Sequence, residues 1–314
     1  MTKTIQHRRH GAITTPATLA GMALGLGLLG ASGPARAQYA YKQINVPGAL
    51  STYADGNTMR RVVGEFEDEN HDWHGFVQTD GVFEQFDVPG AEGYTSVNGV
   101  NLRGQRAGIY FANDRYYGYF WDNGVVQTLD PTNGGFYSAA LFISANGTVV
   151  GYSRNTPTEQ RHGFIWRNGV FTPVDMPGAG PGGTRLQGIN AQGDVVGFYS
   201  DDDRHLHGFV RYGEDDYRNL DVPGSEVEGG YTFAQGINNY GQIVGYYAGA
   251  DGIDHGFVLS MGGYTTINVP DSSWTDIYSI DANGNIVGAF EDDKGVHGFR
   301  GTPSGRLVPD FPAE

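Results

Sequence analysis

The sequence predicts an all-β fold, and three features lead to that prediction. Of the 314 residues, 50 are glycine and 14 are proline, and aromatic residues make up 13%. Short runs of aromatic and β-branched residues alternate with Gly, Asn, Asp and Pro, as strands alternate with turns. No long stretch has the apolar period of 3.6 residues that is typical of a helix.

The stretch Gln235–Pro270 shows the unit from which the chain is built. We expect four short strands in it: one that ends at Ile237, then Gln242–Tyr247, one that opens with His255, and Tyr264–Val269. An acidic loop separates the second strand from the third, and tight turns join the other neighbours.

Three anchors repeat this unit along the chain. A glycine ends an apolar pair in each second strand: Gly64, Gly108, Gly151, Gly197, Gly245 and Gly288. Seven residues before each glycine is a polar turn-forming residue: Asn57, Asn101, Ser144, Asn190, Asn238 and Asp281. The third strand opens with glycine and an aromatic residue: Gly75-Phe76, Gly118-Tyr119, Gly163-Phe164, Gly208-Phe209, Gly256-Phe257 and Gly298-Phe299.

The spacing of the anchors predicts the architecture. Successive units lie 42 to 48 residues apart, and four strands per unit at this period are typical of a β-propeller. Six units predict a six-bladed β-propeller of four-stranded antiparallel blades. Tyr41–Pro47 copies the fourth-strand sequence, so we expect it to complete the last blade. The competing segment, Arg306–Pro312, carries Pro309 and Pro312, which lack a backbone donor.

The repeated motifs carry a resemblance to a known family. His-Gly-Phe, Gly-Ile-Asn-x-x-Gly-x-(Ile/Val)-Val-Gly and Asp-Val-Pro-Gly recur in tandem, and this pattern resembles the HAF family of probable extracellular repeat proteins. Unit two departs most, with Tyr117 in place of His and Leu129-Asp130-Pro131 in place of Asp-Val-Pro-Gly. The resemblance implies export and tandem blades, but no defined activity.

Residues 1–37 have the pattern of a secretory signal peptide. A basic start precedes the apolar run Leu19–Leu29, and Ala35-Arg36-Ala37 is a small-x-small cleavage site. The apolar run is too short to span a bilayer. We therefore expect cleavage after Ala37, a secreted or periplasmic protein, no membrane insertion of the mature chain, and a single propeller domain over residues 38–314.

Composition narrows the partners and the chemistry. The mature chain would hold 16 basic and 35 acidic residues, a net charge of −19, because cleavage removes Lys3, Arg8, Arg9 and Arg36 and no acid. An acidic chain does not favour nucleic acid or an anionic membrane. No cysteine is present, which excludes disulfides and thiolate sites. We expect a monomer.

The entry to the innermost strand of each blade suggests a ligand site. Seven residues before each turn residue stand Leu50, Tyr94, Tyr137, Gly183, Tyr231 and Trp274, and a hydroxyl residue follows each of them. We expect Tyr94, Tyr137, Tyr231 and Trp274 around the mouth of the central channel, where they would stack on flat ligands such as sugar rings. Arg185 and Asp276 break the repeat there and are expected to give polar contacts. The alternative is that the aromatics pack between neighbouring blades. We expect the hydroxyls to tie the loops to a neighbouring blade.

Histidines and acidic loops also recur, but the pattern does not favour a metal or catalytic centre. His74, His162, His207, His255 and His297 occur once per blade, so we expect hydrogen bonds inside the blades. Acidic loops such as Asp201–Asp203 could bind Ca²⁺, but none has calcium-loop spacing, and solvation of the hairpin tips explains them better. No motif of a hydrolase nucleophile, zinc protease or phosphate loop occurs.

These observations favour a non-catalytic exported module that binds a saccharide or a protein on the loop face above the channel. No catalytic residue, metal site or required cofactor is predicted. The alternative is a secreted hydrolase or lyase acting on a polysaccharide or lactone in the channel mouth, with its catalytic groups among the residues that break the repeat, such as Arg185, Asp276 and Tyr278. A structural or surface-assembly protein would share the same sequence features.

Overall fold

The computed structural model describes residues 39–304, which form 24 β-strands and no helix. Four separate sheets have four strands each. They contain β2 (Ser51–Asn57), β3 (Arg61–Glu67), β4 (Trp73–Thr79) and β5 (Val82–Phe86); β6 (Thr95–Val100), β7 (Arg106–Ala112), β8 (Arg115–Asp122) and β9 (Val125–Leu129); β10 (Tyr137–Ile143), β11 (Val149–Arg154), β12 (His162–Arg167) and β13 (Val170–Val174); and β22 (Trp274–Ile280), β23 (Ile286–Asp292), β24 (Gly295–Pro303) and β1 (Tyr39–Ile44).

The remaining strands form one sheet of eight. They are β14 (Thr184–Ile189), β15 (Val195–Ser200), β16 (Leu206–Tyr212), β17 (Asp216–Asn219), β18 (Tyr231–Ile237), β19 (Ile243–Ala248), β20 (Asp254–Ser260) and β21 (Gly263–Ile267). We expected six separate four-stranded sheets. The structure has four such sheets, and the remaining two units share the sheet of eight strands. The cause is one parallel pair, Leu206 with Tyr231, which joins two antiparallel halves. Similar isolated bridges, Trp73 with Tyr94 and Arg161 with Gly183, occur between other neighbouring units.

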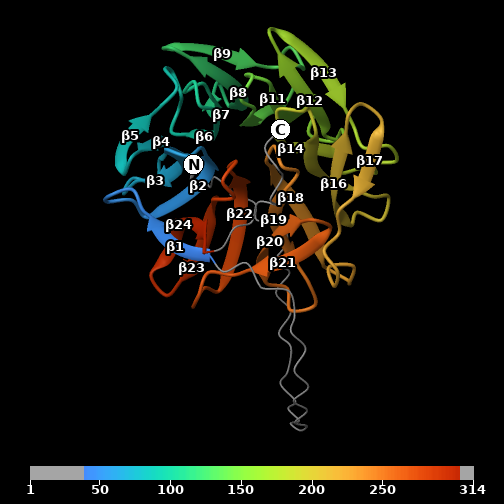
Figure 1. Cartoon of the computed structure of the whole chain (residues 1–314). Coiled ribbons are helices and arrows are strands. Elements are labelled where there is room, and N and C mark those ends of the chain that lie inside the picture. The colour runs from blue at the N-terminus through green and yellow to red at the C-terminus, as the bar shows by residue number, and fades with distance from the viewer. Residues whose placement is uncertain (1–38, 305–314) are drawn as a thin grey trace, which may run out of the picture. The chain divides into compact units, whose positions relative to one another are not determined.

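In each unit the chain runs from an inner strand outward. The inner strands are β2, β6, β10, β14, β18 and β22, and they begin the antiparallel ladders of the six units. Figure 1 shows β5, β9, β13 and β17 at the periphery and the inner strands nearer the centre. Apolar side chains fill the space between neighbouring sheets: Val63 and Val77 of one sheet, for example, pack with Val97 and Val100 of the next.

The first described strand closes the last sheet. β1 pairs with β24 in antiparallel register, from Tyr39 opposite Pro303 to Ile44 opposite Gly298. Tyr39 and Ile44 are both buried. The predicted N-terminal clasp is confirmed, and it removes an open sheet edge. The competing segment Arg306–Pro312 lies outside the described residues.

The anchor glycines are explained by close backbone approach. Gly197 pairs with Phe209, the aromatic of the third-strand anchor, and the other five units repeat this register. A Cβ added to Gly197 would lie 2.1 Å from the carbonyl oxygen of Arg185, and the equivalent distances in the other units are 1.9 to 2.1 Å. Only glycine fits at this position.

The turn after the inner strand is shorter in the first unit than the sequence suggests. In the other units the turn residue pairs with a residue four positions on, as Asn101 does with Gln105, whereas Thr58 pairs with Arg61. The predicted turn residue Asn57 is therefore wrong by one position, and Thr58 takes that place. For the same reason the equivalents of Tyr94 and Thr95 are Ser51 and Thr52, and not Leu50 and Ser51.

Candidate functional site in the central channel

A β-bulge occurs at the same place in every inner strand. The register of each inner strand slips by one residue against its neighbour just before the turn. The extra residues line one cavity together with Phe142, and they are Asp55, Asn98, Leu141, Gln187, Gln235 and Tyr278. Bulges redirect side chains in this way and are frequent beside binding sites.

The cavity has a volume of about 170 Å³. This is below the volume of roughly 300–1,000 Å³ that drug-sized ligands occupy, so the space suits one small group or a single ring. Its walls offer a carboxyl, three carboxamides and a phenol beside apolar surface. Six side chains from six strands thus converge on one point, with different hydrogen-bonding properties on each side.

Aromatic rings continue from this cavity toward the starts of the inner strands. Their contacts form two arcs. One runs through Tyr94, Tyr116, Tyr137 and Tyr152, with neighbouring ring centroids 5.4 to 5.8 Å apart. The other runs through Phe198, Phe233, Tyr246 and Tyr278, with centroids 4.2 to 6.2 Å apart. We call these residues the aromatic belt.

Arg185 joins the two arcs of the belt. Its guanidinium lies 5.5 Å from the ring centroid of Tyr152 and 4.7 Å from that of Phe198. The residue is 8% exposed, and burial lowers its pKa from the usual value. A buried guanidinium between two rings gives this side of the channel a fixed positive charge.

The opposite side of the channel is acidic. Asp55 and Glu65 come from neighbouring strands of the first unit, and Asp276 lies 3.1 Å from the hydroxyl of Tyr278 in the sixth. Burial, and then the negative charge of Glu65, raise the pKa of Asp55 well above its usual value. The channel therefore has an acidic wall in units one and six and a basic group in unit four.

The four predicted aromatics lie at the starts of inner strands, and each is held by the protein. Tyr94 donates a 2.7 Å hydrogen bond to Glu65, and Trp274 donates one of 2.7 Å to Glu291. Tyr231 donates to Asp254, and the hydroxyls of Tyr137 and Tyr152 lie 3.4 Å apart. Trp274 is buried, and the other three are partly buried. They pack within and between units, and their hydroxyl and indole groups are tied to polar partners.

The predicted role of the hydroxyl residues is confirmed. Thr95 Oγ1 accepts a hydrogen bond from the backbone of Val88, at the end of the preceding unit. Thr52, Thr184, Thr232 and Thr275 accept equivalent bonds. In the third unit, Ser138 accepts from Gly118 instead. Each hydroxyl thus fixes the start of an inner strand to its neighbour.

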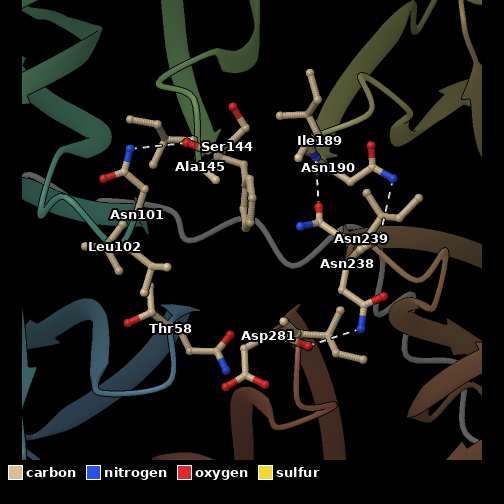
Figure 2. Close-up of a pocket in the computed structure, with 18 of the residues that line it drawn as sticks. Thr58, Asn101, Leu102, Ser144, Ala145, Ile189, Asn190, Asn238, Asn239 and Asp281 are labelled. Atoms are coloured by element: carbon tan, nitrogen blue, oxygen red, sulfur yellow. Dashed lines mark hydrogen bonds between the residues drawn. The ribbon is translucent and has the colours of Figure 1, made fainter. Parts of the chain in front are cut away.

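A second cavity of about 140 Å³ lies at the turn end of the inner strands. Figure 2 shows the turn residues around it, including Thr58, Asn101, Ser144, Asn190, Asn238 and Asp281. The side-chain amides of Asn101, Asn190 and Asn238 each donate to a backbone carbonyl of the next unit, at 3.1 to 3.4 Å. Beneath them a wall of aliphatic side chains consists of Val100, Ile143, Ile189, Ile237 and Ile280. Aliphatic side chains and polar turn residues therefore line this end of the channel together.

The recurrent histidines are confirmed as internal ties. His207 Nδ1 lies 2.9 Å from Asp221 at the end of the fourth strand, and its Nε2 lies 3.3 Å from Asp201 in the acidic loop. His74, His162, His255 and His297 make the same kind of contact to the fourth-strand position. For His297 the partner is Asn45, supplied by the segment after β1. These rings are spread around the periphery.

The acidic loops provide the second partner of most of these histidines. Asp201, Asp251 and Asp292 each contact the histidine that follows. Within residues 39–304, the group whose ligand atoms lie close enough for a metal ion is Asp201, Asp203 and His205. Two of its members are exposed, and loop hydrogen bonds already occupy Asp201. The possible use of Ca²⁺ stays a prediction.

Comparison with known proteins identifies the fold. No family model and no curated protein matches the sequence. A fungal lectin from Aleuria aurantia, described as a six-bladed β-propeller with a novel fucose recognition mode, is 13% identical with a TM-score of 0.50, over 86% of this chain and 99% of that one. The SapL1 lectin in complex with α-methyl fucoside is 13% identical with a TM-score of 0.52, over 84% and 98%. The β-propeller domain of the trilobed protease from Pyrococcus furiosus is 8% identical with a TM-score of 0.51, over 84% and 99%.

The chain is a β-propeller. At these identities the likeness extends to the fold alone, and the four-stranded antiparallel ladders of the structure agree with it. Within residues 39–304 of the propeller, no helix is long and apolar enough to cross a membrane.

Sequence reasoning missed the six bulge residues of the propeller, apart from Tyr278. The repeat draws attention to invariant positions, and the bulge position holds Asp, Asn, Leu, Gln, Gln and Tyr in turn. A signal was nevertheless present. The position follows a small or apolar residue and, in four units, precedes a glycine. A variable position beside a glycine inside a strand indicates a bulge.

Proposed function

We propose that the protein is a carbohydrate-binding module whose ligand enters the central channel. The observation that carries this proposal is the convergence of six bulge residues, of five different types, on one cavity. If these positions only stabilised the repeated fold, the same residue type could occupy all six of them. Different side chains at equivalent positions instead provide an asymmetric set of donors and acceptors.

The chemistry of the cavity suits a sugar. Asp55, Asn98, Gln187 and Gln235 offer both donors and acceptors, which a ring of vicinal hydroxyls can satisfy. Tyr278 and Phe142 supply apolar surface for the carbon face of the ring. Two of the fold neighbours are lectins, and fucose or α-methyl fucoside is named with them. That likeness supports testing fucosides first.

The propeller is proposed to have six blades, because β14–β17 and β18–β21 form complete antiparallel ladders linked by a single bridge. Tyr94, Tyr137, Arg185, Tyr231, Trp274 and Asp276 are proposed to form the rim of the site. Their role would be to hold the channel open and to fix its charges, since each is in contact with other residues of the propeller.

Export is part of the proposal. Cleavage after Ala37 would place the propeller outside the cytoplasm, where free glycans are encountered. The segment concerned, residues 1–37, lies outside the described residues. The HAF resemblance also stays a prediction.

A glycan array tests the function. The full chain should bind a defined group of saccharides, and Gln187→Leu should lose that binding while melting at the wild-type temperature. Parallel arrays with chelator and with added Ca²⁺ decide whether the ion is needed. If no glycan is retained under either condition, the proposed function is wrong.

A further inference from the structure

The acidic wall of the channel contains a carboxyl group that the propeller leaves without a hydrogen bond. Asp55 is the bulge residue of β2 and lines the central cavity. Its Oδ2 atom is buried, and no residue of 39–304 donates a hydrogen bond to it. A buried carboxyl oxygen without a hydrogen bond destabilises the folded protein, and more so when it is charged. A donor from a ligand in the cavity would satisfy this oxygen.

The neighbours of Asp55 indicate the charge of that donor. Glu65 lies on the adjacent strand, in register with Tyr53, and its negative charge helps to raise the pKa of Asp55. Asp276 lies one unit away beside Tyr278, which itself lines the cavity. Asp55 lines the cavity itself, and Glu65 and Asp276 lie next to residues that line it, so a positive charge beside Asp55 would also be attracted by the other two carboxyl groups.

The surroundings of Asp55 favour an organic ammonium group over a metal ion such as Ca²⁺. Aromatic rings flank the acidic side: Tyr53 contacts Trp73 at 5.8 Å, and Tyr246 contacts Tyr278 at 6.2 Å. An organic ammonium gains from aromatic faces, whereas Ca²⁺ requires about six to eight oxygen ligands. Among residues 39–304, Asp55 and Glu65 belong to no group of three acids or histidines with ligand atoms close together. The surroundings favour an ammonium group over a metal ion.

We propose that the Asp55–Glu65 wall binds the ammonium group of an amino sugar, so that the preferred ligand is a saccharide with a free amine. This inference rests on the proposed function and names its substrate class. The amine would donate to Asp55 Oδ2, while the amides of Asn98, Gln187 and Gln235 contact the ring hydroxyls from the other walls.

A matched pair of glycans tests the inference by calorimetric titration of the full chain. Oligosaccharides of glucosamine and of N-acetylglucosamine share one ring and differ in the amine. At a pH where the amine is protonated, the glucosamine oligomer should bind about tenfold tighter or more. Asp55→Asn, which keeps the shape of the side chain, should remove this difference and leave the weaker affinity for the N-acetylated oligomer unchanged.

Two further variants control the experiment. Asp87→Asn removes one negative charge from the outer edge of the same sheet and should retain the preference for the amine. Glu65→Gln should reduce the preference for the glucosamine oligomer by a smaller factor than Asp55→Asn does. If Asp55→Asn does not fold, Glu65→Gln is used in its place. Melting curves of each variant establish folding.

The outcomes separate this inference from the function on which it rests. Equal affinity for the two oligomers overturns the ammonium site and leaves a saccharide-binding module. Binding of CaCl₂ alone that requires Asp55 overturns it in favour of a metal site. Binding of methylammonium through Asp55, with no saccharide bound, supports the ammonium site and contradicts the carbohydrate function. Absence of binding by any of these probes overturns the ammonium site, and the glycan array described above then decides the carbohydrate function.

Discussion

The hydroxyl of Tyr94 donates a 2.7 Å hydrogen bond to Oε2 of Glu65, and this bond joins the second unit of the propeller to the first. Tyr94 stands at the start of β6, and Glu65 is a buried acid of β3. A residue expected to stack on a ligand is thus also a link between neighbouring sheets beside the acidic wall.

Removing this hydroxyl should therefore affect stability. Tyr94→Phe deprives a buried carboxylate of a donor, so we expect a loss of about 1–2 kcal/mol in the free energy of unfolding. Tyr240→Phe is the matched control, because Tyr240 is 53% exposed. Chemical denaturation of both variants measures the effect. Equal stability of the two would show that the Tyr94–Glu65 bond contributes nothing.

The anchor glycines should be intolerant of a methyl group. Gly197→Ala places a Cβ 2.1 Å from the carbonyl oxygen of Arg185, so the ladder must shift, at a cost of about 1–3 kcal/mol or more. Gly263→Ala is the control, since a Cβ there meets its nearest atom at 3.8 Å. Thermal unfolding compares the two. A Gly197→Ala variant as stable as Gly263→Ala contradicts the packing argument.

Deletion of the clasp should open the ring. Loss of Tyr39–Ile44 exposes the edge of β24 and removes two buried side chains, which we expect to cost about 3 kcal/mol and to lower the melting temperature by several degrees. Deletion of residues 306–314 should cost less. The opposite order would mean that the tail, and not β1, is the more important closing segment.

The histidine ties predict a pH dependence. Burial lowers the pKa of His207, but hydrogen bonds and charges from Asp221 and Asp201 outweigh it and raise the pKa above the usual value of about 6.5. The contribution of His207 to stability is thus complete below about pH 6.5 and is lost as the pH rises through the higher folded-state value.

The variant His207→Tyr tests this dependence. Tyrosine is chosen because Tyr117 occupies the equivalent position in the second unit. The difference in melting temperature between the wild type and the variant should be larger at acidic pH and should shrink as the pH rises. A difference that does not change with pH, or that grows as the pH rises, would exclude a stabilising imidazolium at His207.

The sequence predicted the elements that repetition imposes. Three features recur because equivalent positions of every unit have the same packing neighbours: the glycine of the second strand, the histidine tie, and the fourth-strand sequence that is copied at Tyr41–Pro47. The first turn was placed at Asn57 although it begins at Thr58. This turn is one residue shorter than the others, and both residues are polar, so the sequence does not show which one forms the turn. The parallel pair of Leu206 with Tyr231 depends on the contact between the starts of β16 and β18, which leaves no pattern in the sequence.

The candidate site was predicted less well, for a physical reason. Arg185 and Asp276 were found because they interrupt the repeat at strand entry, and both lie beside the channel. Most of the bulge residues were missed, since their orientation comes from a one-residue slip in the ladder between Leu186 and Gly188 and its equivalents. A slip of one residue turns a side chain to the other face of a strand.

The central claim is that saccharides bind in the channel. Its most direct test measures the affinity of one glycan for two variants, Gln235→Leu and Gln85→Leu, and for the wild type. Both variants replace the same amide, one in the channel cavity and one on the outer strand β5. If saccharides bind in the channel, Gln235→Leu should lose about three- to tenfold in affinity, the value of one hydrogen bond, and Gln85→Leu should bind as the wild type does. Unchanged affinity in Gln235→Leu, with a loss in Gln85→Leu, would place the ligand on the outer surface and contradict the account.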